Sequence, residues 1–169
     1  MTPRGEVTVR PATAEDIPSI ASIWHRGWQD GHIGHVPDEL TTARTERSFW
    51  SRTAERLPDT TIAESEGDVA GFVMVVDDEV EQVYVGEDHR GSGVAKVLLA
   101  DAERRVQQSG YDIAWLAVVA GNERARRFYA KCGWVDEGPF DYQAQGPDGP
   151  ITVPSHRYVK AVEPRSPEM

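Results

Sequence analysis

The spacing of apolar residues at the start of the chain predicts a short strand followed by an amphipathic helix. Val7 and Val9 alternate with polar residues, as in a strand with one buried face. Thr13 stands before Asp16 at the spacing of a capping box, so a helix is expected to begin near residue 14. The apolar positions that then recur at helical spacing are Ile17, Ile20, Ala21, Trp24 and Trp28. Glycines and a proline within residues 31–37 end this pattern.

The next segment predicts a second helix and then three strands. The helix is expected over residues 39–57, and Pro58 ends it. Residues 61–64 and 69–76 have strand character and are joined by a Glu-Gly-Asp turn, which indicates an antiparallel hairpin. Residues 79–85 are expected to form the next strand of the same sheet.

The second half of the chain predicts a helix between two parallel strands. The helix begins at Gly93 and ends at Gly110, and its expected buried face is made by Val94, Val97, Leu98, Ala102 and Val106. The continuously apolar residues 113–119 predict a strand buried on both faces. A strand, a helix and a parallel strand place the turn before the helix at the carboxyl edge of the sheet, where ligands bind. Residues 140–159 are expected to form two more strands, joined by a turn at residues 146–150.

The turn before this helix has the composition of a phosphate-binding loop. Gly91 and Gly93 allow the backbone to bend so that successive N–H groups converge on an anion at the helix start. A nucleotide-hydrolase loop is not indicated, because Val94 follows Gly93 where Lys and then Ser or Thr would be needed. A dinucleotide fingerprint is not indicated either, because Lys96 occupies the position of its third small residue. The turn therefore predicts a diphosphate ligand of another kind.

Two segments resemble the GNAT superfamily of N-acetyltransferases. The sequence Arg90-x-x-Gly93-x-Ala95 is similar to the superfamily signature that binds the pyrophosphate of acetyl-coenzyme A. Residues 122–134 are similar to its second cofactor segment, a helix that starts at Asn, carries Phe-Tyr and ends in Gly-aromatic. The resemblance extends over about residues 7–160 and implies a mixed α/β (α+β) fold with a central, mostly antiparallel sheet flanked by helices. A narrower likeness, to phosphinothricin acetyltransferases, rests on the strand-turn-helix and the terminal hairpin.

The resemblance implies acetyl-coenzyme A as cosubstrate and assigns a set of residues to it. The backbone N–H groups of Val83 and Val85 are expected to bind the pantetheine arm and polarise the thioester carbonyl. Asn122 is expected either to hold the same arm or to cap its own helix. The cofactor-binding residues expected in full are Val83, Tyr84, Val85, Arg90, Gly91, Ser92, Gly93, Val94, Ala95, Lys96, Asn122, Arg126 and Tyr129.

Acetyl transfer to an amine requires a base for the ammonium and an acid for the leaving sulfur. Glu79 and Glu81 share one face of their strand by alternation, next to the pyrophosphate turn, and Glu81 is the preferred base. The alternative for both carboxylates is that they pair with cations on the surface. Tyr129 falls where the superfamily presents a tyrosine hydroxyl to the sulfur, and its alternative role is that of a core aromatic.

The acceptor is expected to bind near the first helix. Trp24, Trp28 and His32 are the candidate substrate-binding residues, because aromatic side chains can enclose a cation, although core packing is the alternative for both tryptophans. Three histidines in this region, His25, His32 and His35, do not predict a metal site, because they lack cysteine or carboxylate partners at ligand spacing. No metal is expected.

Composition limits the class of partner. The formal net charge of −10 opposes nucleic acids and anionic membranes and favours a cationic or neutral acceptor. Cys132 is the single cysteine, which excludes an internal disulfide and suits the cytoplasm. No apolar stretch is long enough to span a bilayer. The length suits one domain, expected over residues 1–162, with residues 163–169 as a disordered tail.

The sequence therefore predicts direct acetyl transfer from acetyl-coenzyme A to a primary amine of a small molecule. Direct transfer is favoured because no activated Ser or Cys nucleophile is apparent. Two alternatives stay open: a non-catalytic acyl-coenzyme A sensor or binding module, and an enzyme that acetylates a protein or peptide. A homodimer is also compatible with the size of the chain.

Overall fold

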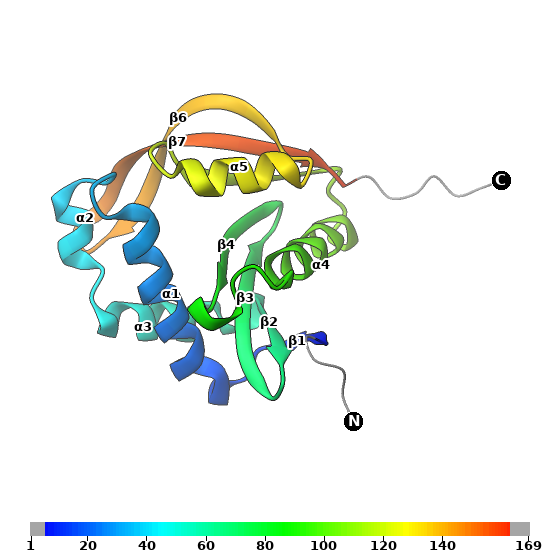
Figure 1. The fold of residues 1–169 in the computed structure, drawn as a ribbon. Helices are drawn as coiled ribbons and strands as arrows, with labels where there is room; N and C mark the ends of the chain where they lie inside the picture. The colour runs from blue at the N-terminus through cyan, green and yellow to red at the C-terminus, as the bar shows by residue number, and fades with distance from the viewer. Residues whose placement is uncertain (1–5, 163–169) are drawn as a thin grey trace.

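The computed structural model describes residues 6–162 and contains a seven-stranded sheet with helices on both faces. The strands lie in the order β1-β2-β3-β4-β5-β7-β6 (Figure 1). Every neighbouring pair is antiparallel except β4 with β5. The mixed, mostly antiparallel fold expected from the sequence is confirmed. The strands are β1 Val7–Pro11, β2 Thr60–Ser65, β3 Asp68–Val76, β4 Glu79–Val85, β5 Ile113–Val119, β6 Val135–Gly146 and β7 Gly149–Ala161.

The helices bury two separate apolar clusters, one on each face of the sheet. The helices are α1 Ile17–His32, α2 Asp38–Ala43, α3 Glu46–Arg56, α4 Val94–Gln108 and α5 Glu123–Lys131. In Figure 1, α4 and α1 lie on either side of β3 and β4. Val73 of β3 packs toward α4, whereas Phe72 and Met74 pack toward α1 and α3. This alternation lets β3 serve both cores.

The helix expected over residues 39–57 is two helices, so that prediction is wrong in this detail. The break falls at Arg44 and Thr45, where the backbone leaves helical geometry. The Thr45 side chain accepts a hydrogen bond from the Ser48 N–H at 3.2 Å and so starts α3 afresh. A threonine that offers its oxygen to the backbone favours a helix start over a helix interior.

Other boundaries also differ from the prediction. Val97 is 37% exposed and does not belong to the buried face of α4. Ile113 is 53% exposed, so β5 is not buried on both faces along its whole length. The terminal hairpin begins at Val135, before the expected residue 140. The expected single domain over residues 1–162 stays a prediction, and the predicted tail at 163–169 lies outside the described residues.

Candidate active site

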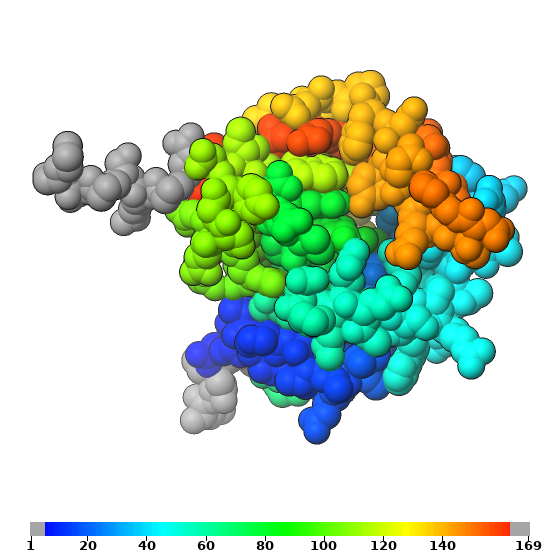
Figure 2. All heavy atoms as spheres, turned by 180° about the vertical axis from the view of Figure 1, so that it is seen from behind, coloured from blue at the N-terminus to red at the C-terminus, as the bar shows by residue number. Residues whose placement is uncertain are grey.

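A cavity of about 280 Å³ lies where β4 and β5 separate, and it collects residues from both halves of the chain. Figure 2 shows the surface hollowed where the β6–β7 hairpin, in orange, faces the cyan atoms near α3. The cavity brings together many of the residues expected at the site. These are Trp28, His32, Glu79, Glu81, Val83, Tyr84, Asn122 and Tyr129.

The cavity exists because β4 and β5 pair at one position. Their parallel ladder joins Glu79 with Trp115, and Val83 and Val85 have no partner on β5. On the other edge of β4, the Gly86 N–H donates to the Ala70 carbonyl at 2.7 Å. Since alternate residues of an antiparallel strand bond to the same neighbour, the backbone N–H groups of Val83 and Val85 point into the gap. The strand therefore offers backbone donors that no strand among residues 6–162 uses.

A β-bulge in β4 turns an additional side chain toward the cavity. Val80 pairs with Val75 and Gln82 pairs with Met74, so Glu81 has no partner residue on β3. Simple alternation would place Gln82 on the opposite face from Glu81. Instead Gln82 lines the same cavity as the two glutamates. A bulge commonly redirects side chains in this way beside binding sites.

The two candidate bases have different surroundings. The Glu79 carboxylate accepts a hydrogen bond from the Tyr142 hydroxyl at 2.9 Å, and burial raises the pKa of Glu79 above its ordinary value. The Glu81 carboxylate is paired with the Arg56 guanidinium, with 2.8 Å between Oε1 and Nε, and its side chain is 13% exposed. The negative charge of Glu81 is thus balanced by the positive charge of Arg56, whereas Glu79 has a hydrogen bond from an uncharged hydroxyl.

Tyr129 comes from α5 and reaches the same cavity. Its ring packs edge-on against Trp134, with 6.3 Å between centroids. Its hydroxyl makes no hydrogen bond within residues 6–162, and burial raises the pKa of the phenol. A phenol with a raised pKa keeps its proton at neutral pH and can donate it. Tyr129 is therefore both a packed aromatic and a free proton donor.

The glycine-rich turn before α4 has the backbone geometry of an anion site. Gly91 and Gly93 have φ values of +78° and +87°, which a residue with a Cβ rarely adopts. A Cβ placed on either glycine would meet no atom within 4 Å, so the space in front of the turn is open. Arg90 borders the turn and pairs with Asp30 at 2.9 Å. Lys96 is exposed in the first turn of α4.

The rest of this segment is held in place by local contacts. The Ser92 hydroxyl donates to the His89 carbonyl, and Val94 is buried beneath the turn. Ala95 is half-buried in the first turn of α4, where N–H groups have no helical partner. Residues 90–96 thus lie at the carboxyl end of β4, as expected from the sequence.

Asn122 caps α5, one of the two roles expected for it. Its Oδ1 accepts a hydrogen bond from the Ala125 N–H at 3.2 Å. Its Nδ2 points toward Gly31 of α1, where an added Cβ would lie 2.8 Å away. Asn122 also lines the cavity, so one amide group caps α5, lies next to α1 and borders the site.

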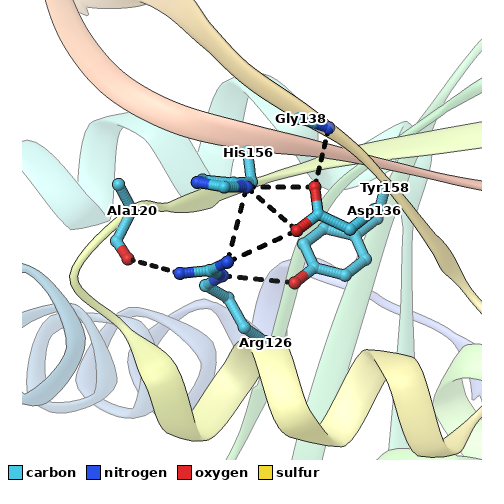
Figure 3. Close-up of polar contacts among 6 residues, drawn as sticks. All are labelled: Ala120, Arg126, Asp136, Gly138, His156 and Tyr158. Carbon is cyan, nitrogen blue, oxygen red and sulfur yellow. Dashed lines mark hydrogen bonds and ion pairs between the residues drawn. The ribbon is translucent and has the colours of Figure 1, made fainter.

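Arg126 does not lie in the cavity, although the sequence placed it among the cofactor residues. Figure 3 shows its guanidinium directed toward β6 and β7 instead. It donates to the Ala120 carbonyl at 3.1 Å and to the Tyr158 hydroxyl at 3.3 Å, and it pairs with Asp136 at 3.3 Å. Asp136 also lies 3.0 Å from Nδ1 of His156. Arg126 thus joins α5 to the terminal hairpin.

The three residues expected to bind the acceptor have different positions. Trp24 is 1% exposed and packs against Phe49 and Phe72, outside the cavity lining, so it is a core residue. Trp28 lines the cavity, and the His32 ring stacks on it with 4.9 Å between centroids. Burial lowers the pKa of His32 to about 4, which keeps the ring neutral.

Several cavity residues were not expected from the sequence. Arg44, Arg52 and Arg56 line one side of the cavity, and Tyr142 faces them from β6. Arg52 and Arg56 lie four residues apart on α3, a spacing that puts both side chains on one helix face. That spacing is visible in the sequence, but nothing in it shows that the face is turned toward β4.

Within residues 6–162, no three His, Cys, Asp or Glu side chains gather closely enough to hold a metal ion. None of the helices in this range has the length and apolar character that a membrane span requires.

Comparison with known proteins agrees with this geometry. The model of the acetyltransferase (GNAT) family matches residues 18–134, which include β4, the glycine-rich turn and α5. This chain belongs to the GNAT family of acetyltransferases. The narrower likeness to phosphinothricin acetyltransferases stays a prediction.

Relatives of known sequence or structure extend the comparison. An uncharacterized N-acetyltransferase of Mycobacterium tuberculosis is 31% identical over 81 residues, covering 45% of this chain and 52% of the relative. The chain thus spans about half the length of such curated relatives. A GCN5-related N-acetyltransferase from Rhodopseudomonas palustris has a TM-score of 0.72 at 22% identity, covering 95% of this chain and 99% of that one. The acetyltransferase YncA from Salmonella typhimurium, described with its cofactor acetyl-coenzyme A, has a TM-score of 0.69 at 16% identity, covering 97% and 98%. These two likenesses show the GNAT fold.

Proposed function

We propose that this chain transfers the acetyl group of acetyl-coenzyme A directly to a primary amine of a small molecule. The observation that carries the proposal is the gap between β4 and β5. Around it lie two carboxylates, a tyrosine hydroxyl and a strand edge with free backbone donors. The glycine-rich turn follows at the end of the same strand. One strand therefore leads from a phosphate-binding turn to a site that can accept and donate protons.

The residues present fit acetyl-coenzyme A, which would supply an activated acetyl thioester. The open turn with positive φ at Gly91 and Gly93 suits the pyrophosphate, with Arg90 and Lys96 as nearby cations. The backbone edge at Val83 and Val85 suits the amides of the pantetheine arm. Further backbone N–H groups come from Ser92, Val94 and Ala95. The cavity that would hold the arm is also lined by Tyr84 and Asn122. The guanidinium of Arg126 is bound to β6, β7 and the Ala120 carbonyl instead.

Glu79 is our preferred general base, with Glu81 as the alternative. An alkylammonium group has an ordinary pKa near 10 and must lose a proton before it can attack. A carboxylate with a raised pKa is a better proton acceptor at neutral pH than one stabilised by a cation. Burial raises the pKa of Glu79, whereas Glu81 is held in an ion pair with Arg56. This order reverses the preference for Glu81 drawn from the sequence.

Tyr129 is proposed as the general acid. Its free hydroxyl and raised pKa keep a proton available for the leaving sulfur. The unpaired N–H groups of β4 would stabilise negative charge on the acetyl oxygen. The proposed acid and the proposed oxyanion donors are thus groups without a hydrogen-bond partner among residues 6–162, whereas the base Glu79 accepts one hydrogen bond, from Tyr142.

The decisive experiment measures release of the coenzyme A thiol from acetyl-coenzyme A with a panel of amines, amino acids and peptides. Glu79→Gln and Tyr129→Phe are expected to lower kcat by roughly 10²–10⁴-fold while acetyl-coenzyme A still binds. Glu81→Gln tests the alternative base, and Glu39→Gln, an exposed carboxylate on α2, is the matched control. Binding of acetyl-coenzyme A without turnover on any amine would contradict the proposal and favour a sensor. Turnover on peptides alone would contradict the small-molecule acceptor. A cytoplasmic location and a homodimer stay predictions.

A further inference from the structure

Two arginines in the cavity, one buried and one half-buried, have no carboxylate partner among residues 6–162. Arg44 is 9% exposed and Arg52 is half-buried, and neither forms an ion pair with any Asp or Glu of residues 6–162. The two carboxylates that line the cavity are otherwise engaged, since Glu81 pairs with Arg56 and Glu79 binds Tyr142. Buried charges are normally paired, because removing a charge from water is costly.

The guanidinium of Arg52 stacks on aromatic rings in a way that leaves its N–H donors available to a ligand. The guanidinium lies over the Trp24 ring at 4.3 Å from the centroid and 5.6 Å from that of Phe49. Stacking uses the faces of the guanidinium and leaves its in-plane N–H donors available. One terminal nitrogen, Nη1, is buried and has no hydrogen-bond partner. Burial and the nearby charge of Arg44 lower the pKa of Arg52 to about 10, so it remains protonated at neutral pH.

Arg44 is fixed by one contact and leaves other donors free. Its Nη2 donates to the Gln145 carbonyl at 2.7 Å, in the strand β6. Its Nε is buried without a partner. Arg44 also lies at the break between α2 and α3. Both unpaired guanidinium groups line the same cavity as the candidate bases.

The cavity therefore has an acidic end and a basic end at a defined spacing. Arg56 reaches Glu81, and Arg52 lies one helical turn away on the same face of α3. Four residues of an α-helix rise about 6 Å. A small acceptor can thus place its amino group at Glu79 and Glu81 and another group at Arg52 and Arg44.

We propose that the acceptor amine carries an oxyanion, a carboxylate or a phosphonate, bound by Arg44 and Arg52, as in an α-amino acid. This inference rests on the function proposed above. In the reaction Glu79 takes a proton from the ammonium group, and the neutral nitrogen forms a bond to the acetyl carbon. The bond from that carbon to sulfur breaks, and the sulfur receives the Tyr129 proton. The acylated nitrogen then gives up its second proton, which restores the Tyr129 hydroxyl, and Glu79 releases its proton to water. The products are an N-acetylated amino acid, or its phosphonate analogue, and coenzyme A.

The cofactor does not account for these arginines. The glycine-rich turn precedes α4, which packs on the opposite face of the sheet from α3. The phosphate-binding turn and the arginine pair therefore serve different ligands. The net charge of −10 favours a cationic or neutral acceptor, and a zwitterionic amino acid is neutral overall, so it meets that expectation while matching the local charges of the cavity.

The substrate test compares closely related amines. For a panel of L-α-amino acids, kcat/KM is measured for the acid, its amide, its decarboxylated amine and its aminophosphonate. Loss of a charged hydrogen-bonding partner should lower kcat/KM by roughly 10–150-fold, so the amide and the amine are expected to be much poorer acceptors. Comparison of kcat/KM for the amino acid with that for its aminophosphonate identifies which oxyanion the site prefers. Equal activity on acids and amides would overturn the inference and leave the acetyltransferase function intact. No turnover on any amine would instead count against the function itself.

The variant test assigns the effect to the arginines. Arg44→Gln and Arg52→Gln are expected to raise KM for the amino acid by roughly 10-fold or more, with KM for acetyl-coenzyme A unchanged. Their activity on the amide should fall much less than their activity on the acid, so that the preference for acid over amide shrinks, whereas a general folding defect would lower both activities equally. Arg47→Gln, an exposed arginine of the same helix, is the matched control. If both arginine variants kept the wild-type preference for acid over amide, the inference would be wrong. Arg52→Lys, which keeps the charge but not the planar fork, should recover part of the preference.

Discussion

Replacing Arg126 by methionine is expected to loosen α5 from the terminal hairpin without weakening the binding of acetyl-coenzyme A. The side chain is 30% exposed and makes its polar contacts to Ala120, Tyr158 and Asp136 (Figure 3). Methionine has a similar helix propensity and keeps an unbranched apolar stem. The change therefore removes the guanidinium contacts and little else.

The magnitude follows from what each partner loses. The Ala120 carbonyl is half-buried and can bind water instead, so it loses the net value of one charged hydrogen bond. Asp136 keeps its contact with His156 at 3.0 Å and its bond from the Gly138 N–H at 2.8 Å, so it is not left unpaired. One or two charged hydrogen bonds and a part-exposed ion pair give a loss of about 2 kcal/mol in the free energy of unfolding. For a chain of this size, that corresponds to a Tm lower by roughly 4–8 °C.

The assay is thermal unfolding of Arg126→Met beside Arg127→Met. Arg127 is the next residue of α5, is 70% exposed and has one ion pair, to Glu123 at 3.9 Å. Its replacement is expected to change the free energy of unfolding by less than about 0.5 kcal/mol. Equal destabilisation by the two variants would refute the structural role of Arg126. A wild-type Tm together with a raised KM for acetyl-coenzyme A would restore its assignment to the cofactor.

Three further predictions test the turn, a buried histidine and the base. Gly93→Ala should raise KM for acetyl-coenzyme A in saturation curves and leave KM for the amine unchanged, because a Cβ is strained at φ +87°; an unchanged cofactor KM would contradict this. His32 has a pKa of about 4 in the fold against 6.5 ordinarily, so the unfolded chain binds a proton that the folded chain does not, and stability falls as pH drops below about 6.5. Denaturant titrations between pH 7 and pH 5 should show a smaller decline for His32→Gln than for wild type, and equal declines would count against a buried neutral ring. The Tyr142 hydrogen bond lowers the pKa of Glu79, so Tyr142→Phe should move the acid limb of the kcat/KM profile to higher pH. A limb that stays in place would favour Glu81 as the base.

The local geometry of the proposed cofactor side could be predicted because its signals are local. Gly91 and Gly93 are required by backbone conformation, and the Asn122 cap is specified within one helical turn. The spacing of apolar residues around these positions also predicted the neighbouring elements, and β4, α4 and β5 lie in the predicted segments of the chain. Such features depend on neighbours in the sequence, so a single sequence contains the information.

The acceptor side could not be predicted to the same extent, because it depends on contacts distant in sequence. The bulge at Glu81 is visible only through the register of β3 against β4. Arg126 resembled a cofactor residue by position, but Asp136 lies before the predicted start of the terminal hairpin, and the sequence did not show that Arg126 reaches that hairpin. The sequence suggested that Trp24 lines the acceptor pocket, but in the structure its ring packs against Phe49 and Phe72 in the core.

We propose that acceptor specificity resides in the terminal hairpin. The family match ends at Trp134, directly before the hairpin of β6 and β7. That hairpin supplies the Tyr142 hydroxyl to Glu79 and the Gln145 carbonyl to Arg44, and so contacts both ends of the proposed acceptor cavity. The glycine-rich turn before α4 makes no contact with Glu79 or Arg44. A change in the hairpin can therefore alter which amine is bound while the binding of acetyl-coenzyme A is retained. Exchange of residues 142–145 is therefore the change most suited to altering the acceptor preference of this chain.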